Sequence, residues 1–284
     1  LVTERRSKDT RDVTIDPSLN GPYDEPARYY VVGPQGPTGE IRDGRRPSES
    51  FVPIPAARKG KKSDDGSVQE SLDVVLTGEK RTRNDRINDL RREVERWRHR
   101  DYERVTPTSR KLLQYWADPL RENRVLFCQR EATETAIFLA EVAGRNGYAD
   151  FRTGLVADND EYNGGLPRVA LKMATGAGKT DVMAMLIAWQ TANKVISPRD
   201  ARFTKRFLVV TPGITIRDRL RVLLPNDPDN YYKQRDLIPP DLLTTSWQAQ
   251  CTSTNCYAFE PREAKESKGV AGNTKKILTA GRDD

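Results

Sequence analysis

The chain has 284 residues, of which 31% are charged and 36% are hydrophobic, and its formal net charge is +7. No apolar run reaches the ~18 residues that indicate a transmembrane helix, and the charged N-terminus lacks the apolar core of a signal peptide. Three scattered cysteines and a single histidine exclude a disulfide scaffold and a zinc site of ordinary spacing. We therefore expect a cytoplasmic protein with no membrane partner, and the basic charge favours an anionic partner such as nucleic acid.

Residues 1–78 form a Pro/Gly-rich region in which we expect irregular structure. Eight prolines lie between residues 17 and 55, interleaved with glycines. Proline lacks a backbone donor and glycine loses more entropy on ordering, so both disfavour long regular elements. Two short apolar stretches, "RYYVV" and "FVPIP", are candidates for edge strands or docking segments.

A basic helical segment is predicted over residues 79–118. Ile87, Leu90, Val94 and Trp97 are spaced by three, four and three residues, which indicates one apolar face of a helix. Nine Lys/Arg and four Asp/Glu residues lie between residues 80 and 100. The charged face therefore either lies along phosphates or is a solvated face with Glu–Arg pairs. A second helix is predicted over 108–118.

Residues 119–284 have the rhythm of an α/β domain with a parallel sheet. Periodicity predicts a helix through 127–142 and a polar loop over 144–166. Strands are predicted at 166–174, 206–211 and 249–255, with helices over 178–192 and 213–224 between them. The segment 227–242 is rich in turn-forming residues.

The stretch "KMATGAGKT" (172–180) is the clearest chemical signal in the sequence. A triphosphate needs several backbone N–H groups aimed at its oxygens, and a glycine-rich turn before a helix N-terminus supplies them. Lys179 would reach the β- and γ-phosphates, and the Thr180 hydroxyl would bind Mg²⁺, so these two are the candidate catalytic residues. The general pattern has glycine at position 173, where this chain has Met173. The predicted phosphate-binding residues are Thr175, Gly176, Ala177, Gly178, Lys179 and Thr180.

The variant "MATGAGKT" resembles motif I of superfamily 2 DEAD/DEAH-type helicases, in particular the restriction (Res) subunit of type III restriction endonucleases. "FLVVTPGITIRDRL" (207–220) is similar to motif Ia, and "FCQREATETA" (127–136) to the helix whose glutamine reads adenine. "TNCYAF" (254–259) is similar to the motif Ib region, although Cys256 and Tyr257 depart from the Tyr-His found there. "NGPYDEP" (20–26) resembles an opening found in such restriction proteins.

This resemblance implies a fold, ligands and partners. The fold would be α/β: an incomplete RecA-like P-loop parallel sheet with helices on both faces, preceded by the irregular region and the helical segment, and truncated before motif II. The cofactors would be ATP and Mg²⁺, with Gln129 reading adenine. The partners would be DNA, bound through its backbone without sequence preference, and a modification methyltransferase subunit. The implied nucleic-acid contacts are Thr211, Pro212, Gly213 and Arg217.

Each of these roles has a simpler alternative. Gln129 is also compatible with a surface position on an amphipathic helix, Thr211 and Gly213 with turn and cap positions, and Arg217 with a solvated helix face. Two other functions also remain open: a stand-alone P-loop nucleotide-binding module or kinase, and a basic nucleic-acid-binding protein with an incidental glycine turn.

The sequence lacks two features that ATP hydrolysis requires. No apolar strand that ends in Asp-Glu follows the phosphate turn, and no arginine motif of a second RecA-like domain is visible. The chain also begins without Met. We therefore expect a piece of a longer helicase or restriction endonuclease, able to bind ATP but not to hydrolyse it alone.

Overall fold

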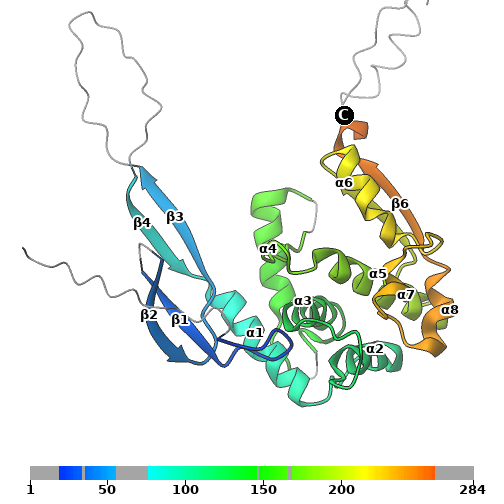
Figure 1. The fold of residues 1–284 in the computed structure, drawn as a ribbon, viewed down its shortest axis with the longest axis horizontal. Helices are drawn as coiled ribbons and strands as arrows, with labels where there is room; N and C mark the ends of the chain where they lie inside the picture. The colour runs from blue at the N-terminus through cyan, green and yellow to red at the C-terminus, as the bar shows by residue number, and fades with distance from the viewer. Residues whose placement is uncertain (1–18, 34–35, 56–75, 146, 166–167, 260–284) are drawn as a thin grey trace, which may run out of the picture.

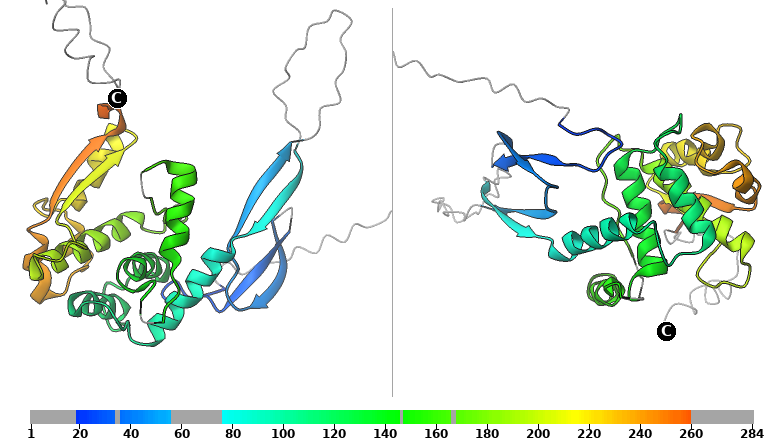
Figure 2. Two further views of the ribbon diagram at one scale, coloured as in Figure 1. Left: turned by 180° about the vertical axis from the view of Figure 1, so that it is seen from behind. Right: turned by 90° about the horizontal axis from the view of Figure 1, so that it is seen from below.

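The computed structural model describes residues 19–33, 36–55, 76–145, 147–165 and 168–259. Two antiparallel hairpins lie side by side at one end of the molecule (Figures 1 and 2). Strand β1 (Arg28–Gly33) pairs with β2 (Gly36–Asp43), and β3 (Glu49–Pro55) pairs with β4 (Leu76–Arg83). Strands at "RYYVV" and "FVPIP" are thus confirmed, and the part of 1–78 that the structure describes is more regular than its composition predicted.

The prolines fit these hairpins because a two-stranded sheet leaves one edge of each strand without a partner. Pro53 and Pro55 are two residues apart in β3, so their missing N–H groups lie on the same edge of the strand. Proline on an edge also hinders pairing with further strands. The prolines thus disfavour long or central strands but are compatible with the short edge strands for which "RYYVV" and "FVPIP" were candidates.

Helix α1 (Asp85–His99) connects the hairpins to the helical body of the molecule (Figure 1). Val94 and Trp97 of the predicted apolar face are fully buried, whereas Ile87 is exposed. The charged face carries ion pairs one turn apart, Arg92 with Asp89 and Arg96 with Glu93. Between the two interpretations of this basic helix, the structure therefore favours a salt-bridged face for most of its length.

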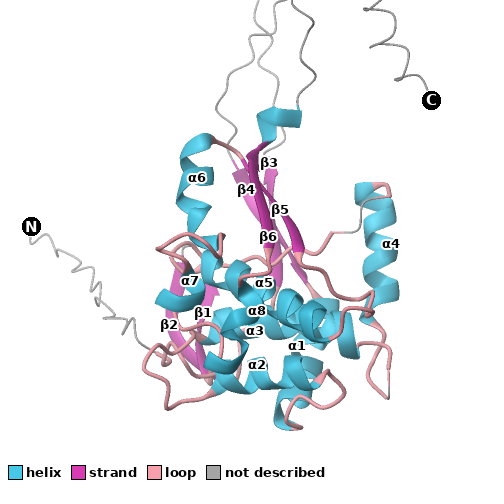
Figure 3. Ribbon diagram, turned by 90° about the vertical axis from the view of Figure 1, so that its right-hand side faces the viewer, coloured by secondary structure: helices cyan, strands magenta, loops and turns pink. Residues whose placement is uncertain are grey.

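The helical body consists of α2 (Pro107–Ala117), α3 (Phe127–Ile137) and α5 (Lys179–Ile196), with a π-helical turn, Phe138–Val142, after α3 (Figure 3). Helix α2 begins where the Thr106 hydroxyl accepts a hydrogen bond from Ser109 N at 3.0 Å, followed by Pro107 in the first turn. Helix α5 packs against both α2 and α3, and the buried side chains of all three form one core. No helix of the described residues is long and apolar enough to cross a membrane.

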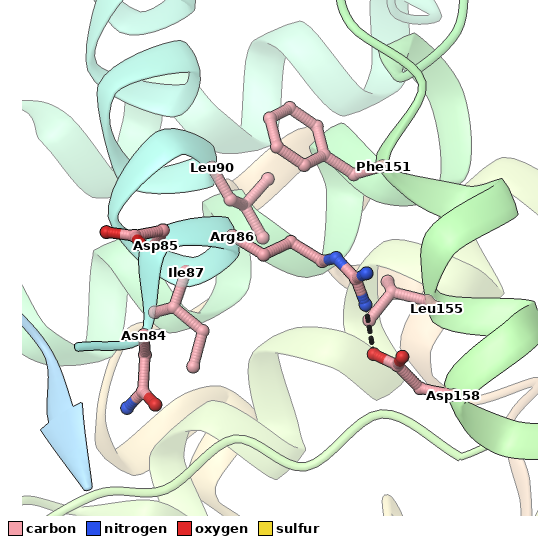
Figure 4. A pocket seen from close by; sticks show the side chains of 8 residues that line it. All are labelled: Asn84, Asp85, Arg86, Ile87, Leu90, Phe151, Leu155 and Asp158. Carbon is pink, nitrogen blue, oxygen red and sulfur yellow. Dashed lines mark hydrogen bonds and ion pairs between the residues drawn. The ribbon is translucent and has the colours of Figure 1, made fainter. Parts of the chain in front are cut away.

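The polar segment 144–166 contains helix α4 (Phe151–Asn163), so the predicted loop was wrong. The Asp150 carboxylate caps the helix by accepting hydrogen bonds from Arg152 N and Thr153 N. A cavity of about 300 Å³ lies between α4 and α1, where Phe151 and Leu155 are placed near Leu90 (Figure 4). The Asp150 cap and the contact with α1 therefore stabilise a helix that the polar composition of this segment did not predict.

An ion pair between Arg86 of α1 and Asp158 of α4 closes this contact (Figure 4). The Arg86 guanidinium also donates to the Gly154 carbonyl at 3.1 Å. A side chain at position 154 would place its first carbon 3.0 Å from the centre of that guanidinium. Glycine inside α4 therefore allows the close approach of Arg86, although it disfavours the helix itself.

Two parallel strands lie at the end of the molecule opposite the hairpins (Figures 1 and 2). Strand β5 (Arg206–Thr211) pairs with β6 (Gln250–Asn255), as the sequence predicted. The connection contains α6 (Ile214–Arg219), α7 (Tyr231–Gln234) and α8 (Leu243–Ser246), with short 3₁₀ turns at Leu220–Leu223 and Pro240–Leu242. A further 3₁₀ turn, Cys256–Phe259, follows β6.

The third predicted strand is absent from the described part of the chain. Residues 168–174 belong to no strand or helix, and Val169 is 57% exposed. Leu208 and Val210 of β5 are exposed as well. An apolar segment becomes a strand only where a neighbouring strand pairs with its backbone groups, and here Arg168 N and O bond to the Asn159 side chain instead. The described residues therefore form a mixed α/β arrangement of helices and two-stranded sheets, and the predicted parallel sheet with helices on both faces is not seen among them.

Truncation of a core leucine in α2 should destabilise the helical body. Leu112 is fully buried, and Leu120, which lies eight residues later, is 91% exposed. Leu112→Ala should lower the free energy of unfolding by about 2–5 kcal/mol because it removes buried methyl groups and leaves a cavity. Leu120→Ala should change it by less than about 0.5 kcal/mol. Urea unfolding measures both variants, and equal losses would contradict the described core.

Candidate nucleotide-binding site

The glycine turn leads directly into the first turn of α5. Gly176 and Gly178 have φ angles of 80° and 70°, in the left-handed region that side chains other than glycine disfavour. Gly178 is the N-cap of α5, and its carbonyl accepts hydrogen bonds from Asp181 N at 3.0 Å and Val182 N at 3.3 Å. The turn therefore presents backbone N–H groups near the positive end of a helix, which is a favourable arrangement for an anion.

Lys179 and Thr180 lie at the start of α5. The Lys179 ammonium group is exposed and donates to the Ala174 carbonyl at 2.7 Å, so the side chain folds back across the turn. Thr180 is half-buried and lines a cavity next to the turn. The turn residues Thr175 and Gly176 are exposed, and Ala177 is half-buried. The structure thus brings the six predicted phosphate-turn residues together in one loop, as their contiguity requires.

Gln129 is buried and connects α3 to α5. Its side-chain oxygen accepts a hydrogen bond from Leu126 N at 2.9 Å, and its amide nitrogen donates to Asp181 Oδ2 at 2.9 Å. A side-chain amide has two donors and two acceptor lone pairs, so each end keeps one further position for a ligand. The surface alternative for Gln129 is therefore wrong, because the side chain lies beside the phosphate turn.

A cavity of about 470 Å³ opens between the glycine turn, the start of α3 and α7. This volume lies within the range of small-molecule sites. On its rim the Arg124 guanidinium lies 4.4 Å from the Tyr23 ring centre, and the Arg235 guanidinium lies 5.3 Å from that of Tyr231. The residues that line the cavity are Tyr23, Glu122, Asn123, Arg124, Val125, Leu126, Gln129, Gly176, Gly178, Thr180, Asp181, Tyr231, Arg235 and Leu237.

Asp181 is the least satisfied polar group of the cavity. Its Oδ1 atom is buried and has no hydrogen-bond partner among the described residues, whereas Oδ2 accepts from Gln129. Burial raises the pKa of this carboxyl group, and the charge of Arg235 and the Gln129 hydrogen bond oppose the rise. A buried carboxylate oxygen without a donor is costly, so this site suits a ligand that brings a donor or a metal-bound water. The described residues contain no cluster of three or more His, Cys, Asp or Glu side chains that could hold a metal without such a ligand.

The sequence did not identify Tyr23, Arg124, Tyr231 or Arg235 as members of one site. Tyr23 belongs to "NGPYDEP", and the carbonyl of the neighbouring Pro22 accepts a hydrogen bond from Phe127 N at 2.9 Å at the start of α3. This contact holds the N-terminal segment against the cavity. The similarity of that segment to other restriction proteins was the only signal that could have placed it there.

The predicted nucleic-acid contacts lie elsewhere, at the end of β5 and the start of α6. Thr211 is buried, and its hydroxyl donates to backbone carbonyls, 3.0 Å from that of Gly213 and 3.3 Å from that of Thr254. Pro212 is exposed and Gly213 is the N-cap of α6. Arg217 forms an ion pair with the adjacent Asp218 at 3.0 Å. Pro212, Gly213 and Arg217 are accessible while Thr211 is buried beneath them, and none of the four lines the cavity.

Comparison with known protein families gives a match over the part of the chain that contains the glycine turn. A family model described as "Type III restriction enzyme, res subunit" matches residues 125–274, which is more than half of the chain. The matched range contains Gln129, the glycine turn and the surface from Thr211 to Arg217. No curated protein and no solved structure matches the chain.

Replacement of Gly178 should cost more stability than replacement of a glycine with the same backbone angle in open space. A methyl group at position 178 would lie 1.9 Å from the Gln129 amide nitrogen, whereas one at Gly165, with φ 69°, would contact nothing within 4 Å. Both substitutions by alanine cost about 1–2 kcal/mol of backbone strain. Gly178→Ala should cost roughly 1–3 kcal/mol more because Gln129 must move.

Urea unfolding of the two glycine variants measures this difference directly. Equal losses of unfolding free energy would mean that Gln129 does not pack against the turn. A larger loss for Gly165→Ala would contradict the described contact as well.

Proposed function

The chain belongs to the type III restriction enzyme res subunit family, and we propose that it supplies the ATP-binding part of a motor that couples ATP hydrolysis to movement on DNA. The observation that carries the proposal is the position of the glycine turn. The turn caps a buried helix and borders a cavity that also contains Gln129. Such a turn offers the backbone N–H groups that bind nucleotide phosphates, and the adjoining cavity offers space for the base.

The phosphates of ATP would bind at the backbone N–H groups of residues 175–180 in this proposal. The Lys179 ammonium group would exchange its contact with the Ala174 carbonyl for the β- and γ-phosphates, which offer a charged acceptor instead of a neutral one. The Thr180 hydroxyl would hold Mg²⁺, which neutralises charge on the phosphates when it is bound. Asp181 Oδ1 follows Thr180 in the chain but is buried, so it would have to be uncovered before it could accept a hydrogen bond from a water on that ion.

The adenine base would occupy the part of the cavity between Gln129 and Tyr23. The free N–H and lone pair of the Gln129 amide match the donor and acceptor pattern on one edge of adenine. Tyr23 offers an aromatic face, and Arg124 already lies over its ring. The hydrogen bond from the Gln129 amide to Asp181 would let the occupancy of the base pocket affect the position of the phosphate turn.

We place the chain in the RecA-like class of P-loop folds, with residues 119–284 as its first ATP-binding domain, 1–78 as an N-terminal region and 79–118 as a connecting segment. In that class, residues 168–174 would form a strand of the sheet that contains β5 and β6. The exposed apolar side chains of Leu208, Val210 and Val169 support this assignment, because they leave surfaces that a wider sheet and its helices would cover.

DNA would contact the surface where β5 ends and α6 begins, at Pro212, Gly213 and Arg217, and the buried Thr211 would hold this turn in place through its hydrogen bonds. The Gly213 backbone allows a close approach, and the Arg217 guanidinium is partly exposed beside Asp218. Contacts of this kind bind the sugar-phosphate backbone without reading bases. We also propose a modification methyltransferase subunit as a protein partner, from family membership alone.

Removal of the Lys179 amine should abolish most of the ATP affinity. Lys179→Ala should weaken binding of a fluorescent ATP analogue by roughly tenfold or more, since a hydrogen bond to a charged group contributes about 1.5–3 kcal/mol. Lys172→Ala is the matched control, because Lys172 is an exposed lysine of the same segment outside the turn. Unchanged affinity in a folded Lys179→Ala variant would refute phosphate binding at this turn.

Loss of the Gln129 amide should reduce the preference for ATP over GTP. A paired amide contact to adenine discriminates by about 1–3 kcal/mol, so Gln129→Ala should lower the ATP/GTP ratio by roughly tenfold in competition titrations. Gln114→Ala is the control, because Gln114 is exposed on α2 and bonds only to Asp101. A ratio that stays the same while both affinities fall would assign Gln129 a purely structural role.

A further inference from the structure

A third cavity, of about 180 Å³, lies where the hairpins join α1, and most of the residues that line it are arginines. We name it the arginine cleft. Its side chains come from the loop between β2 and β3, the end of β4 and the exposed side of α1. The lining residues are Arg45, Arg46, Pro47, Arg83, Asn88, Arg91, Arg92 and Glu95, and none of them lines the cavity beside the glycine turn.

Three of the five arginines are neutralised by carboxylates nearby. Arg45 forms a two-point contact with Glu131, Arg83 pairs with Asp85 at 3.1 Å, and Arg92 pairs with Asp89. The pairs of Arg83 and Arg92 are largely exposed, so they constrain these side chains weakly. Their guanidinium groups keep further N–H donors for another acceptor.

Arg46 and Arg91 differ from the others. Neither forms a hydrogen bond or an ion pair with any residue that the structure describes, and Arg91 is half-buried. Burial and the nearby charge of Arg45 lower the pKa of Arg91, and Glu131, the carboxylate that opposes this, is already held by Arg45. Glu95 also lines the cleft, but no ion pair joins it to Arg91 among the described residues. A partly desolvated guanidinium beside a like charge is unfavourable without a bonded carboxylate, and an anion in the cleft would pair with it.

We propose that the arginine cleft binds a phosphate group through Arg46 and Arg91. A phosphate offers several oxygens in the geometry that guanidinium groups bind with paired hydrogen bonds. The cleft is smaller than the ~300–1000 Å³ of typical small-molecule sites, so it suits a phosphate rather than a whole nucleotide. The group is a backbone phosphate of nucleic acid or a free phosphate ion, and the proposal does not depend on ATP binding at the glycine turn.

The test uses the full 284-residue chain and compares Arg46→Gln and Arg91→Gln with Arg100→Gln. Arg100 is an exposed arginine that follows the same helix and pairs with Glu103, so its replacement removes the same charge outside the cleft. Thermal unfolding first establishes that each variant is folded. Arg46 is exposed, so Arg46→Gln keeps the test valid should Arg91→Gln fail to fold.

The first arm titrates a short duplex DNA by fluorescence anisotropy between about 50 and 200 mM NaCl. Loss of one phosphate contact lowers the salt slope by about 0.9. The parent and Arg100→Gln should therefore lose about three- to fourfold more affinity over this range than either cleft variant. The second arm follows the arginine Nε–H signals by NMR while inorganic phosphate is added. The signals that are missing from the spectra of Arg46→Gln and Arg91→Gln are assigned to these two arginines, and their shifts report whether Arg46 and Arg91 bind phosphate.

A changed slope in the first arm identifies a backbone phosphate as the ligand. Equal salt slopes together with shifts of the Arg46 and Arg91 NMR signals on phosphate addition identify a free phosphate ion as the ligand. Equal slopes for all variants, together with Arg46 and Arg91 signals that do not move, would overturn the proposal. Both measurements are repeated with Lys179→Ala in the background of each protein to separate the two sites. The effects of Arg46→Gln and Arg91→Gln should persist in that background even if the glycine turn binds no nucleotide.

Discussion

The burial of helix α5 is the constraint on which the rest of the structure depends. Nine of its eighteen residues are buried, and α2, α3, α7 and α8 all pack against it. Small residues such as Ala184 and Ala188 allow close approach, while Met185 and Trp189 fill the space between neighbours. Any shift of α5 would open this core, at a cost of several kcal/mol for each cavity of side-chain size. The N-terminus of α5, and with it the glycine turn, is therefore held in one place.

Polar contacts fix how α3 lies along α5. At the start of α3 Gln129 donates to Asp181 of α5. In the π-helical turn after α3, the Glu141 carboxylate accepts hydrogen bonds from the Trp189 indole of α5 at 2.9 Å and from the Ser109 hydroxyl of α2 at 2.5 Å. Glu141 is almost fully buried, and an unpaired carboxylate there would be strongly destabilising. The two helices can therefore take only the register that satisfies both ends. This register keeps the proposed base pocket next to the proposed phosphate turn.

The sequence predicted the elements whose signal is local. Helix α5, strands β5 and β6 and the glycine turn follow from periodicity and from glycines at positions with positive φ. The strand predicted at 166–174 is absent from the described residues, because strand pairing depends on a neighbouring strand and not on the segment itself. Helix α4 was missed because its stability comes from the Asp150 cap and from contacts with α1. The arginine cleft and the contribution of Tyr23 arise from residues distant in sequence, which no local pattern brings together.

Amide hydrogen exchange tests the central claim, that one ATP molecule joins the turn before α5 to the start of α3. The account predicts that Mg-ATP slows exchange in peptides covering residues 174–182 and 122–130, since both segments line one cavity. Mg-GTP should slow exchange in residues 174–182 and affect residues 122–130 less, because GTP has the same triphosphate as ATP but a different base. The hairpins should be unaffected by either nucleotide. Saturating Mg-ATP that leaves residues 174–182 unprotected would contradict the account.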